Sequence, residues 1–452
     1  MRDTQLSCQT ALNDWQTHRY GARSFSLLLR LLHVLAAFSL AWSSHAISSS
    51  DTLDPLVSSA SQNEISVAIL VTPNQRPPYY RVFSRFSEET GISVKIVPKS
   101  DSEYKRWLPM WLYTDIDSPD VLQWQASQRL FAHAKNGVIL PITDIWQSME
   151  LEAALGHINS GVSWQGEIYG LPTSYYHWGL YYNPALIEKY GKPPQTWPEF
   201  TAICEALKRD GIVPIGLGNK NLWPAAAWFD YLDLRINGLA FHQALLAGDL
   251  PFSHPKVREV LTTWKKMIDA GLFNENHALI DWDQVVPELY REKVGFTLMA
   301  NFINSKLNEA NRNEIAFLPF PKIAAIPRYE VAPTDLIMIP KKAKNIIGAK
   351  KFIRFMARAD IQQELNQLLG YLPPHLGAKA GQDLFVEEGA ALLGNAAGVS
   401  QYFDRDAVPT FEKRALPIFA SFLQNPNLNV AITALEQARQ EVYLSEPQLQ
   451  IP

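Results

Sequence analysis

The sequence predicts an α/β protein of two domains, and two observations lead to that prediction. The chain has 452 residues, more than one hydrophobic core usually organises, so two domains are the expected arrangement. Segments with the two-residue alternation of a strand are followed by segments with the spacing of a helix, and this order predicts parallel sheets. A composition of 47% hydrophobic and 19% charged residues is that of a compact globular protein.

The first 46 residues have the features of a secretory signal peptide. Arg19 and Arg23 precede an apolar run over 25–42, and small residues at Ser44 and Ala46 suit a signal peptidase. A membrane anchor is the competing interpretation. However, charged and polar residues interrupt the run, which leaves it shorter than the roughly 20 apolar residues that a spanning helix needs.

We therefore expect cleavage of a signal peptide at 1–46, followed by a Ser-rich flexible leader at 47–63. Cys8 lies far upstream of the cleavage site, so no lipid attachment site is evident there. Cys204 is then the one cysteine left, and it cannot close an internal disulfide. The expected location is the periplasm, without a lipid anchor.

Strands and helices alternate at the start of the mature chain. Ile65, Val67, Ile69 and Val71 lie on one face of a predicted strand at 64–71. A Pro-rich turn at 72–78, a helix at 82–90 and a strand at 92–97 follow, and then a buried strand at 120–124 and a helix at 127–136. Gly91 and Gly137 mark the ends of the two helices.

The pattern continues over the rest of the chain. Thr196 and Glu199 have the spacing of a capping box and predict a helix start. Apolar runs at 293–298 and 335–339 predict two more strands, and the stripe at 349–357 predicts an amphipathic helix. A further helix at 360–370 and a mostly helical tail from 406 to 443 complete the prediction.

Several kinds of chemistry lack a signature. The net charge is -4, and no basic run is interleaved with aromatic residues, so nucleic acid is not an expected partner. The histidines are scattered, and no nucleotide-binding glycine loop or nucleophile elbow occurs, so we expect no metal, cofactor or serine hydrolase site. Asp281 and Asp283 are the most suggestive carboxylate pair for a glycosidase, but solvated or helix-capping acids explain them more simply.

Three blocks of sequence carry a family likeness. They are DVLQWQASQRLFAHAKNGVILPI at 120–142, EIYGLPTSYYHWGLYYNPALIEKYGKPPQTWPEF at 167–200 and AKKFIRFMARADIQQEL at 349–365. In this order they resemble the carbohydrate-type extracellular solute-binding proteins of ABC importers, the group that includes maltose-binding proteins.

The resemblance implies a two-lobed periplasmic binding protein fold with hinge crossovers and a ligand cleft between the lobes. The first lobe would comprise 64–176 plus 335–371, and the second 177–334 plus 372–452. The chain would cross between them near 175–178, 331–335 and 370–374.

The aromatic residues around the first crossing suggest what the cleft binds. A pyranose presents patches of C–H bonds above and below a rim of hydroxyls, and the negative face of an aromatic ring attracts such C–H groups. Trp124 is the leading candidate contact because it stands just past the carboxyl end of a buried strand, although a core role for it stays open. The other candidate ligand-binding residues are Tyr175, Tyr176, Trp178 and Trp223, then Trp282, Asn301 and Asp335, which the family pattern places, and Arg76 and Tyr79 from the Pro-rich turn.

The resemblance implies a monomeric binding protein, not an enzyme, that presents a carbohydrate to the permease subunits of an ABC importer. Two alternatives stay open. The stretches TPNQRPPYY and DSEYKRWLPMWLYTDID are unusual for the family, which suggests a co-receptor for a sensor kinase or chemoreceptor. A carbohydrate-active lyase or hydrolase on the same scaffold is the third hypothesis.

Overall fold

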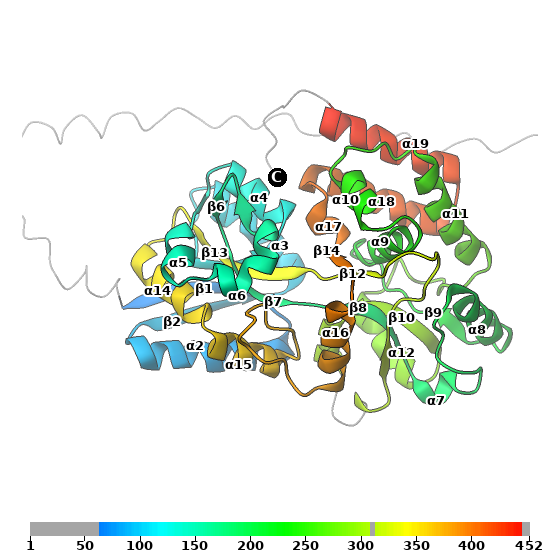
Figure 1. The fold of residues 1–452 in the computed structure, drawn as a ribbon, viewed down its shortest axis with the longest axis horizontal. Coiled ribbons are helices and arrows are strands. Elements are labelled where there is room, and N and C mark those ends of the chain that lie inside the picture. Colours follow the sequence, from blue (N-terminus) through cyan, green and yellow to red (C-terminus); the bar gives the residue numbers. More distant parts are fainter. Residues whose placement is uncertain (1–62, 308–311, 445–452) are drawn as a thin grey trace, which may run out of the picture. The chain divides into compact units, whose positions relative to one another are not determined.

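The computed structural model describes residues 63–307 and 312–444, and these form two α/β lobes (Figure 1). The expected signal peptide and all but the last residue of the expected leader lie outside the described residues. Within the described residues, no helix is both long and apolar enough to cross a membrane.

The first lobe is built around a six-stranded sheet of order β2-β1-β3-β13-β4, in which β7 also pairs with β13. This sheet is built from two separate parts of the chain, because β13 comes late in the sequence but lies between the early strands β3 and β4. The strands are β1 (Glu64–Leu70), β2 (Ser93–Lys99), β3 (Val121–Gln125), β4 (Ile139–Leu140), β7 (Leu171–Tyr175) and β13 (Thr334–Pro340).

The second lobe contains a four-stranded sheet of order β11-β8-β10-β9. Every residue of β8 and β10 is buried, as expected for central strands that helices cover on both faces. The strands are β8 (Trp178–Tyr182), β9 (Val213–Ile215), β10 (Val294–Ala300) and β11 (Ala316–Leu318).

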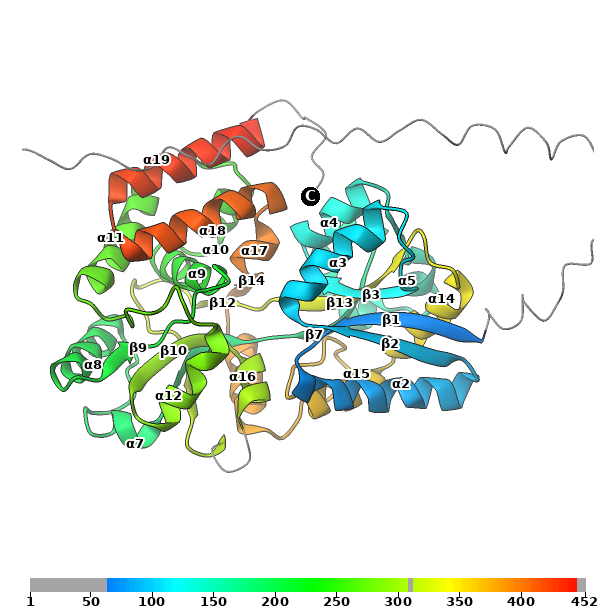
Figure 2. The same ribbon diagram turned by 180° about the vertical axis from the view of Figure 1, so that it is seen from behind.

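Helices surround each sheet (Figures 1 and 2). The first lobe carries α2 (Arg76–Thr90), α3 (Asp101–Tyr113), α4 (Gln128–Lys135), α5 (Thr143–Ser148), α6 (Glu152–Leu155), α14 (Ile346–Met356) and α15 (Ala359–Leu369). The second carries α7 (Pro184–Ile187), α8 (Trp197–Arg209), α9 (Pro224–Ile236), α10 (Leu239–Leu246), α11 (Pro255–Asp269), α12 (Val286–Tyr290), α16 (Leu384–Gly394), α17 (Phe403–Asp406), α18 (Pro409–Gln424) and α19 (Leu428–Arg439).

Short elements complete the described chain. The 3-10 turns are η1 (Pro73–Gln75), η2 (Gly156–Gly161), η3 (Trp282–Gln284) and η4 (Asn301–Lys306), and a π-helical turn, η5 (Gln440–Leu444), follows α19. Two small ribbons pair β5 (Ser163–Trp164) with β6 (Glu167–Ile168) and β12 (Tyr329–Val331) with β14 (Gly398–Ser400).

The predicted strands and helices are present, but the prediction of parallel sheets is wrong for much of both sheets. Only β1, β2 and β3 in the first sheet and β9 and β10 in the second are parallel. The strand β13 runs antiparallel to β3, β4 and β7, and β8 runs antiparallel to β10 and β11. A helix that connects two neighbouring strands of one sheet makes those strands parallel. Strands that enter a sheet from the other lobe have no such connection, so their direction is not set in this way.

Two helix starts also differ from the prediction. The Pro-rich segment predicted as a turn already contains the first turn of α2. Proline is tolerated in the first turn of a helix because the amide hydrogens there have no partner within the helix. The helix α3 was not predicted. Its start has a capping signature, in which Glu103 accepts a hydrogen bond from the Ser100 amide at 3.1 Å.

The first crossing between the lobes falls where the sequence places it. The strand β7 belongs to the first sheet and ends at Tyr175, while β8 belongs to the second and begins at Trp178. Near the second predicted crossing, β12 pairs with β14, and β13 joins the first sheet two residues later. Leu372 forms two backbone hydrogen bonds with Tyr175, at 3.0 and 3.3 Å, so the third predicted crossing lies beside the first.

His177 lies inside the first crossing and is fully buried. Its Nε2 is 3.2 Å from the hydroxyl of Tyr181, and its ring packs edge-on against Phe317 at 4.8 Å. Burial lowers the pKa of His177 to about 3, because the charged imidazolium is poorly solvated there.

We predict that this buried histidine weakens the fold in mild acid. Below its ordinary pKa of about 6.5, the unfolded chain binds a proton at His177 that the folded chain does not bind, so stability falls as pH drops from there toward 3. Urea unfolding at several pH values measures this effect on the mature protein and on a His177→Gln variant. The free energy of unfolding should fall less steeply with pH in the variant, with slopes that differ by up to about 1.4 kcal/mol per pH unit. Equal slopes for the two proteins would contradict the prediction.

Candidate functional site

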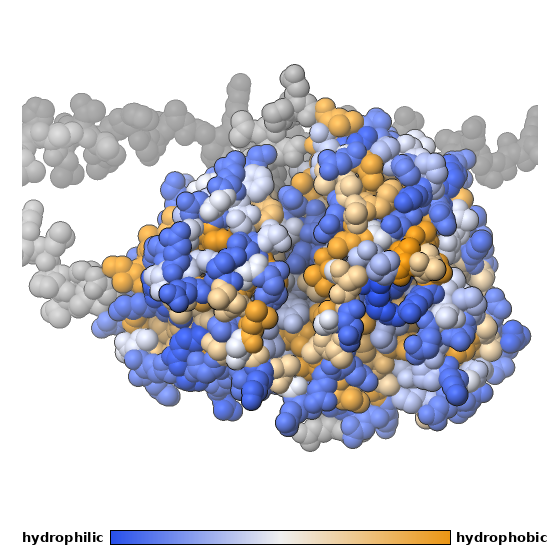
Figure 3. All heavy atoms as spheres, in the orientation of Figure 1, coloured by the Kyte–Doolittle hydropathy of each residue, from blue (hydrophilic) through white to orange (hydrophobic). Residues whose placement is uncertain are grey.

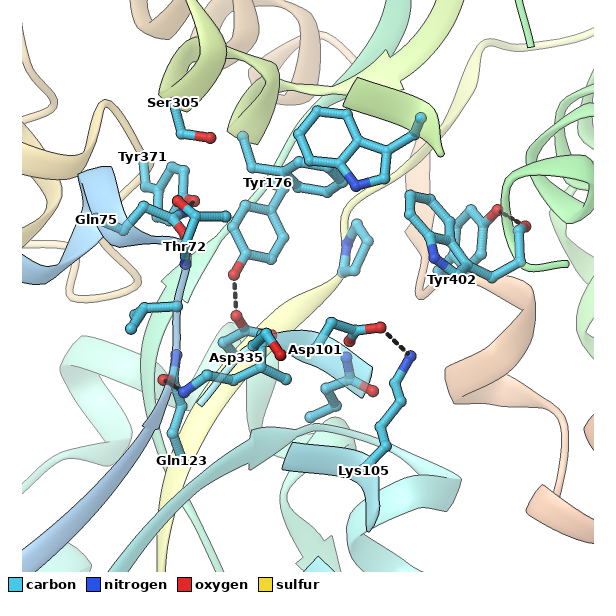
Figure 4. Close-up of a pocket in the computed structure, with 18 of the residues that line it drawn as sticks. Thr72, Gln75, Asp101, Lys105, Gln123, Tyr176, Ser305, Asp335, Tyr371 and Tyr402 are labelled. Carbon is cyan, nitrogen blue, oxygen red and sulfur yellow. Dashed lines mark hydrogen bonds and ion pairs between the residues drawn. The ribbon is translucent and has the colours of Figure 1, made fainter. Parts of the chain in front are cut away.

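A pocket of about 380 Å³ lies between the lobes, beside the crossing segments. Figure 3 shows a furrow between the two halves of the molecule, and Figure 4 shows side chains from both halves facing one space. The volume lies at the lower end of the roughly 300–1,000 Å³ range of small-molecule sites. The pocket is therefore large enough for a small molecule and too small for a folded partner.

One wall of the pocket is aromatic, and Trp178 stands at its centre. The indole of Trp178 stacks on Tyr402, with ring centroids 4.7 Å apart and an interplanar angle of 19°. Trp223 and Phe302 present themselves edge-on to Trp178 at 6.2 and 6.1 Å, and Trp282 extends the wall at 5.1 Å from Phe302. These rings come from separate segments of the second lobe and the first crossing, so the wall exists only in the folded protein.

The position of Trp178 follows from its place in the chain. As the first residue of β8, it pairs with Ala300 of β10, and its carbonyl accepts a hydrogen bond from Tyr231 at 2.9 Å. The side chain is 2% exposed, and its indole Nε1 has no hydrogen-bond partner among residues 63–307 and 312–444. A buried donor without a partner is costly, so this N–H is suited to an acceptor on a bound molecule.

The floor of the pocket is polar and lies where the chain crosses between lobes. The Tyr176 hydroxyl donates a hydrogen bond to Asp335, and Arg405 forms an ion pair with the same carboxylate at 3.0 Å. Burial raises the pKa of Asp335 to about 6, although Arg405 acts in the opposite direction. Tyr371 packs edge-on against Tyr176 at 4.9 Å and accepts a hydrogen bond from Gln75.

The first lobe contributes the edge of its sheet and the start of α3. Gln123 accepts a hydrogen bond from the Leu70 amide at 2.9 Å and donates one to the Tyr79 hydroxyl at 3.1 Å. Gln125 is the last residue of β3, and its side-chain oxygen is buried with no partner among the described residues. Asp101 and Lys105 of α3 form an ion pair at 3.1 Å, which Figure 4 shows at the side of the pocket opposite the aromatic wall.

Direct contacts also join the lobes around the pocket. Arg129 of α4 is buried and bonds to Asp404 at 2.9 Å and to Glu412 at 2.8 Å. On another side, Asn74 of η1 donates a hydrogen bond to the Ser305 carbonyl of η4 at 3.1 Å. These contacts hold the two lobes close together, as in the closed state of a two-lobed protein.

Seven of the ten residues predicted from the sequence line this pocket. They are Trp124, Tyr176, Trp178, Trp223, Trp282, Asp335 and Tyr79. Trp124 contributes little surface, because it is 6% exposed, stacks on Tyr104 at 6.0 Å and donates its indole N–H to the Arg129 carbonyl. It also lies within β3 rather than past its end, so packing accounts for most of its contacts.

The other three predicted residues do not line the pocket. The backbone of Tyr175 pairs with Leu372, and the Asn301 side chain donates a hydrogen bond to the Gly370 carbonyl at 2.8 Å. Arg76 begins α2 and is half-buried. Asn301 still serves the site indirectly, since it ties η4 to the third crossing.

The sequence reasoning missed several pocket residues. Phe302, Tyr371 and Tyr402 complete the aromatic wall and floor, and Gln125, Ser305, Asp404 and Arg405 add polar groups. The stretch 400–406, SQYFDRD, holds an aromatic pair among charged residues after a Gly-rich segment, and this was a usable signal. Nothing in the local sequence of Gln125 or Ser305 distinguishes them from surface residues.

The carboxylate pair considered for catalysis is explained by local contacts. Asp281 precedes η3, and its amide donates to the Gln284 side chain at 2.8 Å while its carboxylate accepts from Asn221. Asp283 forms an ion pair with Lys306 at 2.8 Å. Asp281 is the N-cap residue of a capping box at the start of η3, which fits the capping explanation.

The Gly-Leu-Gly segment at 216–218 is a packing feature of this site. A Cβ atom on Gly218 would lie 2.2 Å from the Asp281 carbonyl oxygen and 2.6 Å from the Trp282 amide nitrogen. Only glycine allows the two loops to approach so closely. This approach places Trp282 and Trp223, one from each loop, in the same pocket.

Two lobes, crossing segments between them and a pocket at their interface define a two-lobed binding protein of the periplasmic type. The chain belongs to the family of bacterial extracellular solute-binding proteins, whose sequence model matches residues 72–363.

Solved structures agree with this fold. The bacterial solute receptor AcbH, described as having an exclusive preference for β-D-galactopyranose, superimposes with a TM-score of 0.79 at 23% identity, over 85% of this chain and 99% of that one. A chitin oligosaccharide binding protein superimposes with a TM-score of 0.74 at 18% identity, over 84% of this chain and 99% of that one. At these identities the likeness concerns the fold.

Relatives by sequence include the melibiose/raffinose/stachyose-binding protein MelE of Bacillus subtilis, which is 22% identical over 59% of this chain and 64% of its own. An ABC transporter extracellular-binding protein of Pyrococcus horikoshii is 26% identical over 58% of this chain and 59% of its own. The matched part of the chain thus spans about three-fifths of the length of these relatives.

We predict that Gly218→Ala destabilises the protein. The added Cβ would collide with backbone rather than with a movable side chain, and such overpacking costs about 1–3 kcal/mol. Thermal unfolding followed by circular dichroism measures the effect. Gly394→Ala is the matched control, because its Cβ would have no atom within 4 Å; equal melting temperatures for the two variants would contradict the prediction.

Proposed function

We propose that this protein binds a short carbohydrate between its lobes in the periplasm and delivers it to an ABC importer, without catalysing a reaction. The observation that carries the proposal is the aromatic wall, in which Trp178, Trp223 and Tyr402 gather around one pocket between the lobes. Membership of a solute-binding family agrees with it.

An aromatic wall opposite polar side chains matches the two kinds of surface of a sugar ring. Ring faces attract the C–H patches of a pyranose, and buried polar groups at the edge bind its hydroxyls. Trp178 has an N–H, and Gln125 has a side-chain carbonyl oxygen, with no hydrogen-bond partner in the part of the chain that the structure describes. A ligand that lacks the matching hydroxyl would leave such a group unsatisfied, which is the basis of strong discrimination.

The residues proposed to contact the ligand are the predicted residues Tyr176, Trp178, Trp223, Trp282, Asp335 and Tyr79, with Trp124 in a supporting position. To these we add Gln125, Phe302, Ser305 and Tyr402, which the sequence reasoning had missed. Tyr175, Asn301 and Arg76 are proposed to act through backbone or loop position instead, because they do not line the pocket.

Ligand binding is proposed to act by closing the lobes. We propose that the two lobes are those expected from the sequence, 64–176 plus 335–371 and 177–334 plus 372–452. The backbone amides of His375 and Lys379 donate to Gln362 and Gln363 of α15, so the start of the last segment also contacts the first lobe. A ligand that touches both lobes favours the closed state by the contacts it makes only there. The closed monomer is then the form that the permease subunits recognise.

The names of relatives support a sugar as the ligand. MelE is named for melibiose, raffinose and stachyose, and AcbH is described by its preference for galactopyranose. Neither name identifies the sugar for this chain, so the ligand is best sought among galactose-containing and other short glycans.

The direct test is titration calorimetry of the mature protein against a panel of mono- and oligosaccharides, with tryptophan fluorescence as a second measurement. We expect at least one short glycan to bind and to change the fluorescence, since three tryptophans form the wall. Absence of heat and of fluorescence change across the whole panel would contradict the proposed function.

We further predict that Trp223→Ala weakens binding of that glycan by about tenfold or more, because it removes ring contact and apolar burial from the wall. Trp107→Ala is the matched control, since Trp107 lies on α3, is 39% exposed and does not line the pocket. Equal affinities for the two variants would show that Trp223 does not contact the ligand.

A further inference from the structure

We propose that the pocket selects a ligand without charge, so that it accepts neutral glycans and rejects their acidic, phosphorylated and amine-bearing counterparts. This inference rests on the proposed function and specifies the class of carbohydrate. It is based on the pairing of charges around the pocket.

Every charged side chain that lines the pocket has a partner of opposite charge within the described part of the protein. The pairs are Asp101 with Lys105 at 3.1 Å, Asp283 with Lys306 at 2.8 Å, Asp335 with Arg405 at 3.0 Å and Asp404 with Arg129 at 2.9 Å. Arg129 lies behind the lining and is shared between Asp404 and Glu412. Each charged group of the lining is thus in contact with a counter-charge, so none is left unpaired for a charged ligand to bind.

Two of these pairs are buried and cannot be given up at low cost. Asp335, Arg405, Asp404 and Arg129 have side chains that are 13% exposed or less. A charged ligand that took one member of such a pair would leave the other buried and unpaired, which is strongly unfavourable. Both pairs also join the lobes, since β13 and α4 belong to the first and α17 to the second.

The other two pairs lie on opposite sides of the pocket and are partly exposed. Asp101 and Lys105 are neighbours on α3, while Asp283 and Lys306 bring η3 and η4 together. Lys306 also lies 5.9 Å from the centre of the Trp282 ring. Each side therefore presents one cation beside one anion, and neither sign prevails in the space between them.

Five polar atoms of the pocket-lining residues are buried and have no hydrogen-bond partner within the described residues. They are the Trp178 Nε1, the Gln125 Oε1, the Ser305 Oγ, the Thr72 Oγ1 and the Asp335 Oδ1, and only the last is charged, in its ion pair with Arg405. The Nε1 is a donor, the Oε1 is an acceptor, and each hydroxyl is both. Hydroxyl groups supply both functions, so a neutral polyhydroxylated ligand that reaches these atoms can pair with all four uncharged ones, whereas a carboxylate or phosphate can use only the donors.

The inference is tested by calorimetry on the mature protein with matched glycans. The pairs are galactobiose with digalacturonate, N,N′-diacetylchitobiose with its deacetylated dimer, and the glycan found by the panel with the uronate made by oxidising its primary hydroxyl. We expect each charged member to bind at least about tenfold more weakly than any neutral member that binds, since about 1.4 kcal/mol corresponds to that ratio.

A charged member that binds as tightly as its neutral counterpart overturns this inference and leaves the proposed function standing. If no glycan of either kind binds, the proposed function fails, and this inference fails with it.

A charge variant tests the same idea from the protein side. Lys306→Met keeps the apolar stem but leaves Asp283 without its cation. The free carboxylate can then pair with an amine, so the affinity for the deacetylated dimer, relative to that for N,N′-diacetylchitobiose, should rise by about fivefold. Lys189→Met is the matched control, since it breaks a similar ion pair with Glu292, at 2.5 Å, and neither residue lines the pocket. An unchanged ratio in Lys306→Met would overturn the role of this pair in selection.

Discussion

The stack of Trp178 on Tyr402 is the contact on which the pocket depends. It joins the first residue after a crossing between the lobes to a segment near the end of the chain, and Trp223 and Phe302 then pack against it. The Tyr402 hydroxyl donates to the Trp223 carbonyl at 2.6 Å, so a single tyrosine fixes both a ring and the loop that carries another. The crossing and the binding wall are therefore one structure.

The sequence predicted the features that depend on local pattern. Alternation predicted β1, and the spacing of Thr196 and Glu199 predicted α8. Trp223 was a candidate because it follows a predicted strand and a Gly-rich loop, whereas the first crossing and Trp178 were placed by the family resemblance. The family resemblance supplied what local pattern could not, namely that these segments meet in a cleft.

The rest could not be predicted because it depends on which segments become neighbours. Whether β13 runs parallel or antiparallel is decided by the lobe from which it enters, and no residue of β13 encodes that direction. Gln125 and Ser305 acquire their importance from burial without a partner, a property of the assembled pocket. The packing of Trp124 depends on such a neighbour too, since the Tyr104 ring that stacks on it belongs to α3, a helix that the sequence does not predict.

The place of β13 within the first sheet restricts how the lobes can move. It is held on one side by β3 and on the other by β4 and β7, and Arg405 bonds to its first residue, Thr334, at 2.7 Å. Its pairing on both sides stiffens this strand, so any bending of this crossing is expected in the short link before it, at Ala332 and Pro333. When one lobe rotates about such a link, an atom moves farther the more distant it is from the link. A pair of spectroscopic labels at the outer rims of the two lobes would therefore report a large change of distance on opening, and a pair beside Pro333 would report almost none.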